Sequence, residues 1–137
     1  MKMIHETEIK VRFAETDALG HVNNTNFFVY MEVARIEFFE KLDTSMSINK
    51  WPFIVASAKC DFIEQTFFNQ TLIIETTLSR IGSKSFTLTH RMKDKETGKT
   101  VAKGEVVIVH FNFEAQQSEV IPPKMREVLE QYLISVA

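Results

Sequence analysis

Polar and apolar residues alternate near the start of the chain, a pattern that is typical of a β-strand with one buried face. Over residues 7–13 the charged side chains fall on one side of the predicted strand. The opposite, buried side is expected to carry Thr7, Ile9, Val11 and Phe13. Residues 14–24 then contain few large hydrophobic side chains and include Asp17, Gly20, Asn23 and Asn24, so they predict an ordered loop.

A long helix is predicted over residues 25–42. Its apolar residues surround most of the circumference, and a helix that is apolar nearly all round is typically buried. The asparagines that precede it can supply an N-cap. Glu32 and Arg35 are three residues apart on one face, a spacing that allows an ion pair, and we expect this pair to be structural.

The rest of the chain consists mainly of predicted strands. Strand patterns cover residues 53–63, 72–81, 85–92 and 101–113, and residues 94–99 are typical of a hairpin loop. In the first of these strands, one face is expected to carry Ile54, Ala56, Ala58, Cys60 and Phe62. A last short helix opens at Pro122 and Pro123, because proline is tolerated in a first helical turn. Its apolar stripe is Met125, Val128, Leu129 and Tyr132.

These elements predict an α+β fold in one domain over residues 1–137, a length that suits a single domain. A helix that is apolar on nearly every side needs cover on every side, and one antiparallel sheet curled around it would supply that cover. The strands through residues 81–92 and 101–113 are too apolar to lie alone at an exposed sheet edge. They therefore predict association with further copies of the chain.

Composition and charge exclude several classes of function. The formal net charge is −2 and the charges are interspersed, so no basic face for nucleic acid is expected. Cys60 is the only cysteine, which excludes an intrachain disulfide and gives no basis for a cysteine-based metal site. The chain shows neither a signal-peptide pattern nor an apolar run that could cross a bilayer. We therefore expect a cytoplasmic protein without membrane insertion.

The candidate chemistry lies in residues 17–24, between the first strand and the long helix. Asp17 places a carboxylate among apolar neighbours, and Gly20 permits an unusual backbone angle or the close approach of a ligand. The helix start beyond offers free backbone N–H groups and the positive end of the helix dipole. Acyl transfer requires at least a base, such as a carboxylate, next to an N–H donor that can bind the oxyanion. The alternative is that these residues only shape a turn and cap the helix.

The motif is similar to that of a known family. The stretch Asp17-x-x-Gly20-His21-Val22-Asn23-Asn24-x-x-Phe27-x-x-Tyr30-x-Glu32-x-Ala34-Arg35 resembles the signature of hot-dog-fold acyl-CoA thioesterases of the 4-hydroxybenzoyl-CoA thioesterase-like superfamily. The predicted order of elements is similar along the whole chain. The resemblance implies a hot-dog fold, in which one antiparallel sheet wraps around a long central helix. It also implies hydrolysis of an acyl- or aryl-CoA to a free acid and coenzyme A.

The same resemblance implies roles for individual residues. Asp17 is expected to be the nucleophile or general base, and the backbone N–H of Asn24 the oxyanion donor. His21 is either catalytic or hydrogen-bonded within the loop. Phe27 departs from the pattern, because many relatives have a tyrosine there, so no hydrogen bond is expected from that position. No Gly-x-Ser-x-Gly motif is present, and nothing in the sequence therefore supports an α/β-hydrolase mechanism.

Coenzyme A is expected only as part of the substrate, with no other cofactor and no metal. Within the motif its binding is expected to involve Gly20, Val22 and Asn23. A second group of candidate coenzyme A contacts lies at a strand turn and consists of Arg80, Ser83, Lys84 and Ser85. The alternative for this second group is an ordinary polar turn.

Two other functions stay open at this stage. One is hydrolysis of acyl groups from acyl carrier protein, although few cations mark a surface for an acidic carrier. The other is non-catalytic binding of acyl chains, against which the intact Asp17 argues. The resemblance further implies a homodimer that assembles into a homotetramer, with each active site at the junction of two subunits.

Overall fold

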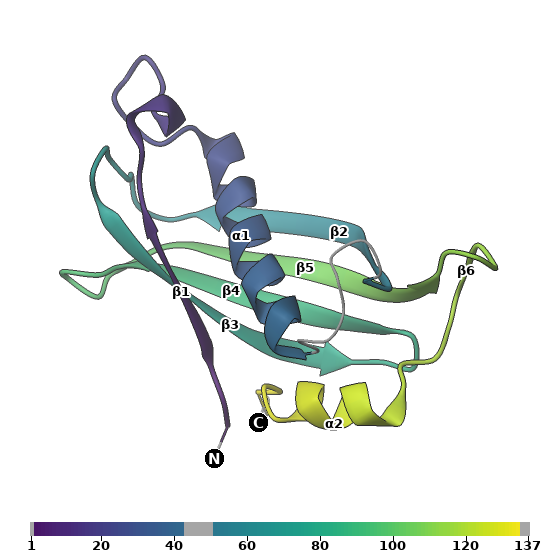
Figure 1. Cartoon of the computed structure of the whole chain (residues 1–137). Coiled ribbons are helices and arrows are strands. Elements are labelled where there is room, and N and C mark those ends of the chain that lie inside the picture. Colours follow the sequence, from purple (N-terminus) through teal and green to yellow (C-terminus); the bar gives the residue numbers. More distant parts are fainter. Residues whose placement is uncertain (1, 43–50, 135–137) are drawn as a thin grey trace.

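The computed structural model describes residues 2–42 and 51–134. The elements in chain order are β1 (His5–Lys10), a short 3-10 helix (Phe13–Glu15), α1 (Asn24–Leu42), β2 (Phe53–Phe62), β3 (Thr71–Ile81), β4 (Ser85–Asp94), β5 (Thr100–Asn112), β6 (Gln117–Ser118) and α2 (Pro123–Glu130). The strands form one antiparallel sheet in the order β1-β3-β4-β5-β2, and β6 pairs with β5. α1 lies across one face of the sheet, and α2 lies near one end (Figure 1). The predicted α+β architecture is confirmed.

α1 supplies the centre of the hydrophobic core. Its buried side chains include Tyr30, Met31, Ala34 and Phe38. The close approach of helix and sheet requires a residue without a side chain in β5, because a Cβ atom at Gly104 would collide with the thioether of Met31. The helix therefore packs onto the sheet over a position that only glycine can occupy without a shift.

β1 ends earlier than the alternation of residues predicts. The expectation of a buried Phe13 is wrong, because this side chain is 74% exposed. The chain leaves the sheet at Arg12, whose backbone N–H and guanidinium both donate hydrogen bonds to the carboxylate of Glu15. These bonds start the 3-10 helix and turn Phe13 away from the core. The hydrogen bonds between Arg12 and Glu15 therefore end the strand before Phe13, although the alternation of polar and apolar residues continues to that position.

A β-bulge in β2 changes which of its residues face α1. Phe53 stacks on Phe39 of α1 with ring centroids 4.2 Å apart, and Phe62 packs edge-on against Phe27 at 5.5 Å. Positions 53 and 62 would point to opposite faces of a regular strand, because side chains alternate. A register shift in the first half of β2 inserts one residue and allows both to face the helix. Ala56 is the inserted residue without a partner in β5, and Ile54 does not share a face with Phe62. The predicted common face of Ile54, Ala56 and Phe62 is therefore wrong.

One side of α1 and both edges of the sheet stay open in the described part of the single chain. The expected cover of the helix on every side is not reached, because Phe28, Val29 and Val33 are exposed. The edge strands are β1 and β2. The prediction that residues 81–92 and 101–113 lie at sheet edges is wrong, because β4 and β5 each have a neighbour on both sides. Which strands lie at the edges depends on the order of the strands in the sheet, and the apolar pattern of a single strand does not predict that order.

The C-terminal helix forms where the prolines predict it. Pro122 occupies the N-cap position, and Pro123 is the first helical residue. Leu129 and Tyr132 are buried, and the ring of Tyr132 packs edge-on against Phe38 of α1 at 4.9 Å. α2 and the residues after it thus cover the end of the core beneath the C-terminal half of α1. None of the helices within residues 2–42 and 51–134 is both long and apolar enough to cross a membrane.

A row of polar side chains crosses the sheet beneath α1. His5, Thr76 and His90 are register neighbours on β1, β3 and β4, and all three are buried. Nδ1 of His90 lies 2.9 Å from Oγ1 of Thr76, whereas Nε2 has no hydrogen-bond partner among the residues that the structure describes. Burial lowers the pKa of His90 to about 3, and the nearby charge of Arg35 contributes to this shift. His90 is therefore neutral in the folded protein at neutral pH.

We expect His90 to make the protein less stable in mild acid. In the unfolded chain its imidazole takes up a proton below pH 6.5, whereas in the folded protein it resists protonation down to about pH 3. As the pH falls through this window, the free energy of unfolding decreases by up to about 1.4 kcal/mol per pH unit from this group. Denaturant unfolding of the wild type and of His90→Gln between about pH 6.5 and 5, above the range in which carboxylates titrate, measures the effect. Equal pH slopes for the two proteins would contradict it.

Candidate active site

The loop between β1 and α1 folds back on itself at residues 17–21. The N–H of Gly20 donates to the carbonyl of Asp17 at 3.0 Å, and the N–H of Asp17 donates to the carbonyl of His21 at 2.7 Å. Gly20 has a φ of 82°, the left-handed conformation that favours glycine. A Cβ atom at this position would meet nothing within 4 Å. The backbone angle, and not the close approach of a neighbouring group, is therefore the structural reason for this glycine.

Backbone donors of this turn orient the Asp17 carboxylate. Its Oδ1 accepts hydrogen bonds from the N–H of Leu19 at 2.9 Å and from the N–H of His21 at 3.3 Å. No residue in the ranges 2–42 and 51–134 donates a hydrogen bond to Oδ2, and the side chain is exposed in the single chain. One carboxylate oxygen is thus held in place while the other can reach a ligand or a water molecule.

The start of α1 leaves one backbone N–H free. Asn23 caps the helix, because its Oδ1 accepts from the N–H of Thr25 at 3.0 Å and its carbonyl accepts from the N–H of Asn26 at 2.8 Å. The side chain of Asn23, which the resemblance assigned to coenzyme A, therefore has a structural partner. The N–H of Asn24 has no acceptor in the described part of the chain. It stands at the positive end of the helix dipole, where anions bind.

Asp17 and Asn24 line the same cleft, which has a volume of about 220 Å³. The walls come from the loop, from the first turn of α1 and from residues 62–66 at the end of β2. His21, Val22 and Phe27 also contribute to this lining. A residue whose carboxylate could act as a base and a residue with an N–H at a helix start therefore line one cleft, and acyl transfer can use both groups.

The other motif residues mainly hold the cleft together. Val22 is buried, and its N–H donates to the carbonyl of Thr66 at 2.7 Å, which ties the loop to the segment after β2. The ring of His21 packs edge-on against Phe67 at 5.2 Å. Phe27 is buried against Tyr30 and β2, in the packing position expected for a residue without a hydroxyl.

A buried carboxylate that the sequence analysis missed fixes the loop onto α1. Oε1 of Glu15 accepts hydrogen bonds from the hydroxyl of Tyr30 and the N–H of Arg12, both at 2.8 Å. The guanidinium of Arg12 binds Oε2 at 2.6 and 2.9 Å, and the carbonyl of Glu15 accepts from the N–H of Asn23 at 2.9 Å. Burial raises the pKa of Glu15, but the bonds from Arg12 and Tyr30 outweigh burial, so this pKa lies below its usual value. The charged carboxylate therefore joins the loop, the N-cap and the helix.

The sequence contained one signal for this contact. Arg12 and Glu15 are three residues apart, the spacing at which a side chain can bind back to a preceding N–H. Thr66 was also missed: its Oγ1 is buried beside the cleft with no partner among the residues that the structure describes. No pattern in residues 62–66 marks them as part of a site, because only the fold brings them next to the loop.

The second predicted group lies far from the cleft in the single chain. Residues 82–84 form the turn between β3 and β4, and at the base of this turn Nη2 of Arg80 donates to Oγ of Ser85 at 3.3 Å. β3 starts beside the Asp17 loop and spans 11 residues, which places this turn about 30 Å away. The carbonyl of Ser83 accepts from the N–H of Ile121, and the carbonyl of Gly82 accepts from the guanidinium of Arg126, so α2 lies beside the turn. Figure 1 shows the loop before α1 and the β3–β4 turn at opposite ends of the sheet. Asp17 belongs to that loop and Lys84 to that turn.

Comparison with known proteins identifies the family. The profile of the thioesterase-like superfamily matches residues 11–129, so the chain belongs to this superfamily. The solved structure of a predicted thioesterase from Bacillus stearothermophilus superposes with a TM-score of 0.90 at 30% identity, over 98% of this chain and 100% of that one. The hot-dog fold and the thioester hydrolase class that the motif implies are thereby confirmed.

Curated sequences give the same result. The uncharacterized protein YsmA of Bacillus subtilis is 39% identical over 109 residues, which cover 79% of this chain and 73% of YsmA. The long-chain acyl-CoA thioesterase FadM of Escherichia coli is 27% identical over 128 residues, which cover 92% of this chain and 97% of FadM. The similarity therefore extends over nearly the whole domain and is not confined to the motif.

Removal of the Tyr30 hydroxyl is expected to loosen the loop. In Tyr30→Phe the buried Glu15 carboxylate loses a donor, which costs about 1–3 kcal/mol because the bond is to a charged group. Denaturant unfolding measures this loss, and faster hydrogen exchange at the N–H groups of Gly20 and His21 locates it. The control is Tyr132→Phe, which removes a tyrosine hydroxyl that no described residue binds. Equal stability and equal exchange in the two variants would contradict the role of Glu15.

Proposed function

We propose that the protein hydrolyses the thioester of an acyl-CoA in the cleft beside Asp17. The observation that carries this proposal is that Asp17, whose Oδ2 no described residue binds, lines the same cleft as Asn24, whose N–H has no described acceptor. Similarity to FadM over 92% of the chain supports acyl-CoA as the substrate class. Coenzyme A enters and leaves as part of the substrate and product, and no other cofactor is invoked.

The N–H of Asn24 is the oxyanion donor in this mechanism. When the thioester carbonyl is attacked, its oxygen gains negative charge. An N–H that is already fixed at the positive end of α1 stabilises this charge without reorganisation, and one such donor contributes about 10²–10³ in rate. The cap formed by Asn23 serves this function, because it occupies the donors of Thr25 and Asn26 and leaves that of Asn24 free.

Asp17 supplies the carboxylate through Oδ2. As a general base it takes a proton from the water that attacks the carbonyl carbon. As a nucleophile it attacks the carbon itself, and water then hydrolyses the resulting anhydride. In both routes the C–S bond breaks and coenzyme A leaves as a thiolate, a fair leaving group because a thiol has a pKa near about 8.5. Heavy oxygen found in Asp17 after a single turnover in heavy-oxygen water would identify the anhydride route, because attack of water on the Asp17 carbonyl carbon of the anhydride leaves the label there.

A hydrolysis panel tests the substrate class. Acyl-CoAs of increasing chain length, aryl-CoAs and acylated carrier protein are offered, and release of free thiol is measured. Turnover of acyl-CoA supports the proposal. Exclusive turnover of the carrier protein would favour the alternative acyl carrier protein thioesterase, and tight binding without turnover would favour a non-catalytic acyl-chain-binding protein.

Substitution of Asp17 is expected to abolish most turnover while the fold is kept. Asp17→Asn retains an oxygen for the N–H groups of Leu19 and His21 but cannot act as a base. We expect kcat to fall by about 10²–10⁴ with little change in KM, because the carboxylate acts in the transition state. Asp17→Ala should behave similarly. The control is Glu96→Gln, which changes an exposed carboxylate in the β4–β5 turn and should keep a normal kcat. A near-normal kcat in folded Asp17→Asn would show that Asp17 takes no part in the chemistry.

We also propose a homodimer in which two β2 edges pair and two α1 helices lie side by side. The support is the open edge at β2 together with the exposed apolar side of α1 formed by Phe28, Val29 and Val33. Two-fold dimers are also the commonest homo-oligomers. Association of two dimers into a homotetramer stays a prediction.

A two-fold axis of this kind would complete the active site. Antiparallel pairing of the β2 edges reverses the partner, so the start of one α1 lies beside the C-terminal half of the other. With the axis at the middle of residues 28–33, residue 24 of one helix lies level with about residue 37 of the other. The same reversal brings Lys84 of the partner subunit to the end of the sheet at which Asp17 lies. The cation is then available to the phosphates of coenzyme A.

A charge on the exposed side of α1 is expected to separate the subunits. Wild-type protein should sediment at twice 15.9 kDa or more, and Val29→Glu should sediment at 15.9 kDa with hydrolysis largely lost. The physical reason is the cost of burying an unpaired carboxylate in an apolar interface. Glu96→Lys, which changes a charge on a distant turn, serves as the control. A fully active monomer would overturn both the dimer and the shared site.

A further inference from the structure

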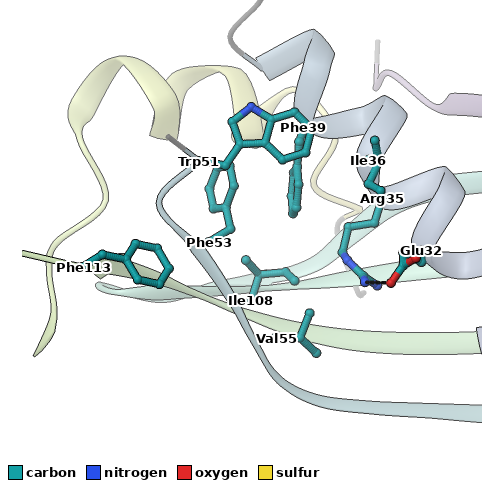
Figure 2. Close-up of a pocket in the computed structure, with 9 residues that line it drawn as sticks. All are labelled: Glu32, Arg35, Ile36, Phe39, Trp51, Phe53, Val55, Ile108 and Phe113. Atoms are coloured by element: carbon teal, nitrogen blue, oxygen red, sulfur yellow. Dashed lines mark ion pairs between the residues drawn. The ribbon is translucent and has the colours of Figure 1, made fainter. Parts of the chain in front are cut away.

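A second hollow lies beside the C-terminal half of α1 and is separate from the Asp17 cleft. It has a volume of about 400 Å³ and is bounded by α1, by residues 51–55 and by β5 (Figure 2). Most of its lining is aromatic or aliphatic, with Phe39, Trp51 and Phe53 on one side. A concave, mainly apolar hollow with a few polar groups is the usual form of a small-molecule site.

Aromatic contacts fix the walls of this hollow. Phe53 stacks on Phe39 at 4.2 Å, and the ring of Trp51 meets Phe39 edge-on at 5.5 Å. Phe53 also packs edge-on against Phe86, a fully buried residue of β4. Because its walls are tied to the core, the hollow exists before any ligand binds, and binding does not require the walls to be ordered first.

Arg35 is the unusual member of the lining. Its side chain is only 14% exposed, and burial lowers its pKa, although the group stays charged. The carboxylate of Glu32 lies 3.8 Å from the guanidinium, beyond hydrogen-bond distance, and is itself 58% exposed. The pair that the sequence predicts does form, but it is not a buried pair. Within residues 2–42 and 51–134, no group accepts a hydrogen bond from Arg35. Arg35 lines the hollow, and its guanidinium carries five N–H donors.

We propose that this hollow receives the acyl group of the substrate, and that Arg35 selects acyl groups with an oxygen at the end far from the thioester. This inference rests on the proposed thioesterase activity. The apolar walls fit the hydrocarbon part, and the guanidinium binds an acceptor oxygen through charge-assisted hydrogen bonds. A carboxylate fits the guanidinium fork directly, and a hydroxyl can accept from Arg35 while it donates to Glu32. A methyl end offers the guanidinium no acceptor.

The position of the hollow suits a thioester held by the partner. Within one chain Arg35 follows Asn24 by three turns of helix, about 16 Å along the axis, and the two hollows share no lining residue. In the proposed dimer, Asn24 of the partner subunit lies level with about residue 37, one half-turn beyond Arg35. The thioester at one helix start would then lie beside the hollow of the other chain.

The test compares matched substrates on four proteins. Hexanoyl-, octanoyl- and decanoyl-CoA are each prepared with a methyl, a hydroxyl or a carboxylate end, and kcat/KM is measured for wild type, Arg35→Met, Glu32→Gln and Lys95→Met. Wild type should prefer an oxygen-bearing end over methyl by about tenfold or more at the best chain length, as expected for one charge-assisted hydrogen bond. In Arg35→Met this preference should disappear or reverse. A purely structural role for Arg35 would lower all rates together and leave the ratio unchanged.

The remaining variants sharpen the test. Glu32→Gln removes the nearby carboxylate and should increase the preference for a carboxylate end. Lys95→Met removes a cation from another exposed ion pair, that with Glu8, and should leave the ratio unchanged. If Arg35→Met fails to fold, an unchanged ratio in Glu32→Gln overturns the proposal by itself.

Failure of the proposed function can be distinguished from failure of this inference. If wild type hydrolyses acyl-CoAs but prefers methyl ends, and the ratio is the same in Arg35→Met, the inference is wrong and the thioesterase stands. If no acyl-CoA is hydrolysed, calorimetric binding of the same substrates decides the question. Binding that is tighter for oxygen-bearing ends in wild type but not in Arg35→Met supports the hollow, and equal binding overturns it.

Discussion

The bond between the Glu15 carboxylate and the Tyr30 hydroxyl is the contact on which the geometry of the active site depends. It joins the segment before the loop to the second turn of α1, so that the loop between them must form a closed arch. Within that arch the Glu15 carbonyl also holds Asn23, and Asn23 in turn sets the residue at which the helix begins. The free N–H of Asn24 and the orientation of Asp17 both follow from where this arch closes. A carboxylate that takes no part in the proposed chemistry thus determines the positions of the groups that do.

The local parts of the site could be predicted from the sequence because their chemistry is local. The turn at Gly20, the asparagine cap and the helix beyond depend on residues a few positions apart, and the motif contains all of them. The long-range contacts could not be predicted in this way. Thr66 reaches the cleft only because the end of β2 comes to lie beside the loop, and the strands at the sheet edges follow from the pairing order. Phe13 is the clearest example of a wrong prediction. It continues the regular alternation of apolar and charged residues, which predicts a buried side chain, but its side chain is exposed to solvent.

Two features that are unfavourable in a single chain share one explanation. These features are the exposed apolar side of α1 and the open β2 edge, both of which have a cost in water. A separate observation is that the two groups of residues expected to contact coenzyme A lie at opposite ends of the sheet. A two-fold axis beside β2 would cover the apolar side of α1 and the β2 edge, and it would bring the coenzyme A groups of the two subunits together. It would also place the aromatic hollow of one chain next to the helix start of the other. Stability of the assembly and completeness of the site would then depend on the same surface.

The bulge in β2 gives the two halves of this strand independent faces. It lies between the part that stacks on Phe39 and the part that packs on Phe27, so each half contacts a different end of α1. Deletion of one residue at the bulge would restore a regular strand and turn one of these halves toward solvent. The chain would then lose either the aromatic wall of the hollow or the packing behind the Asp17 cleft, but not both. β2 is therefore the place where a change of length, rather than of residue type, would alter one hollow and spare the other.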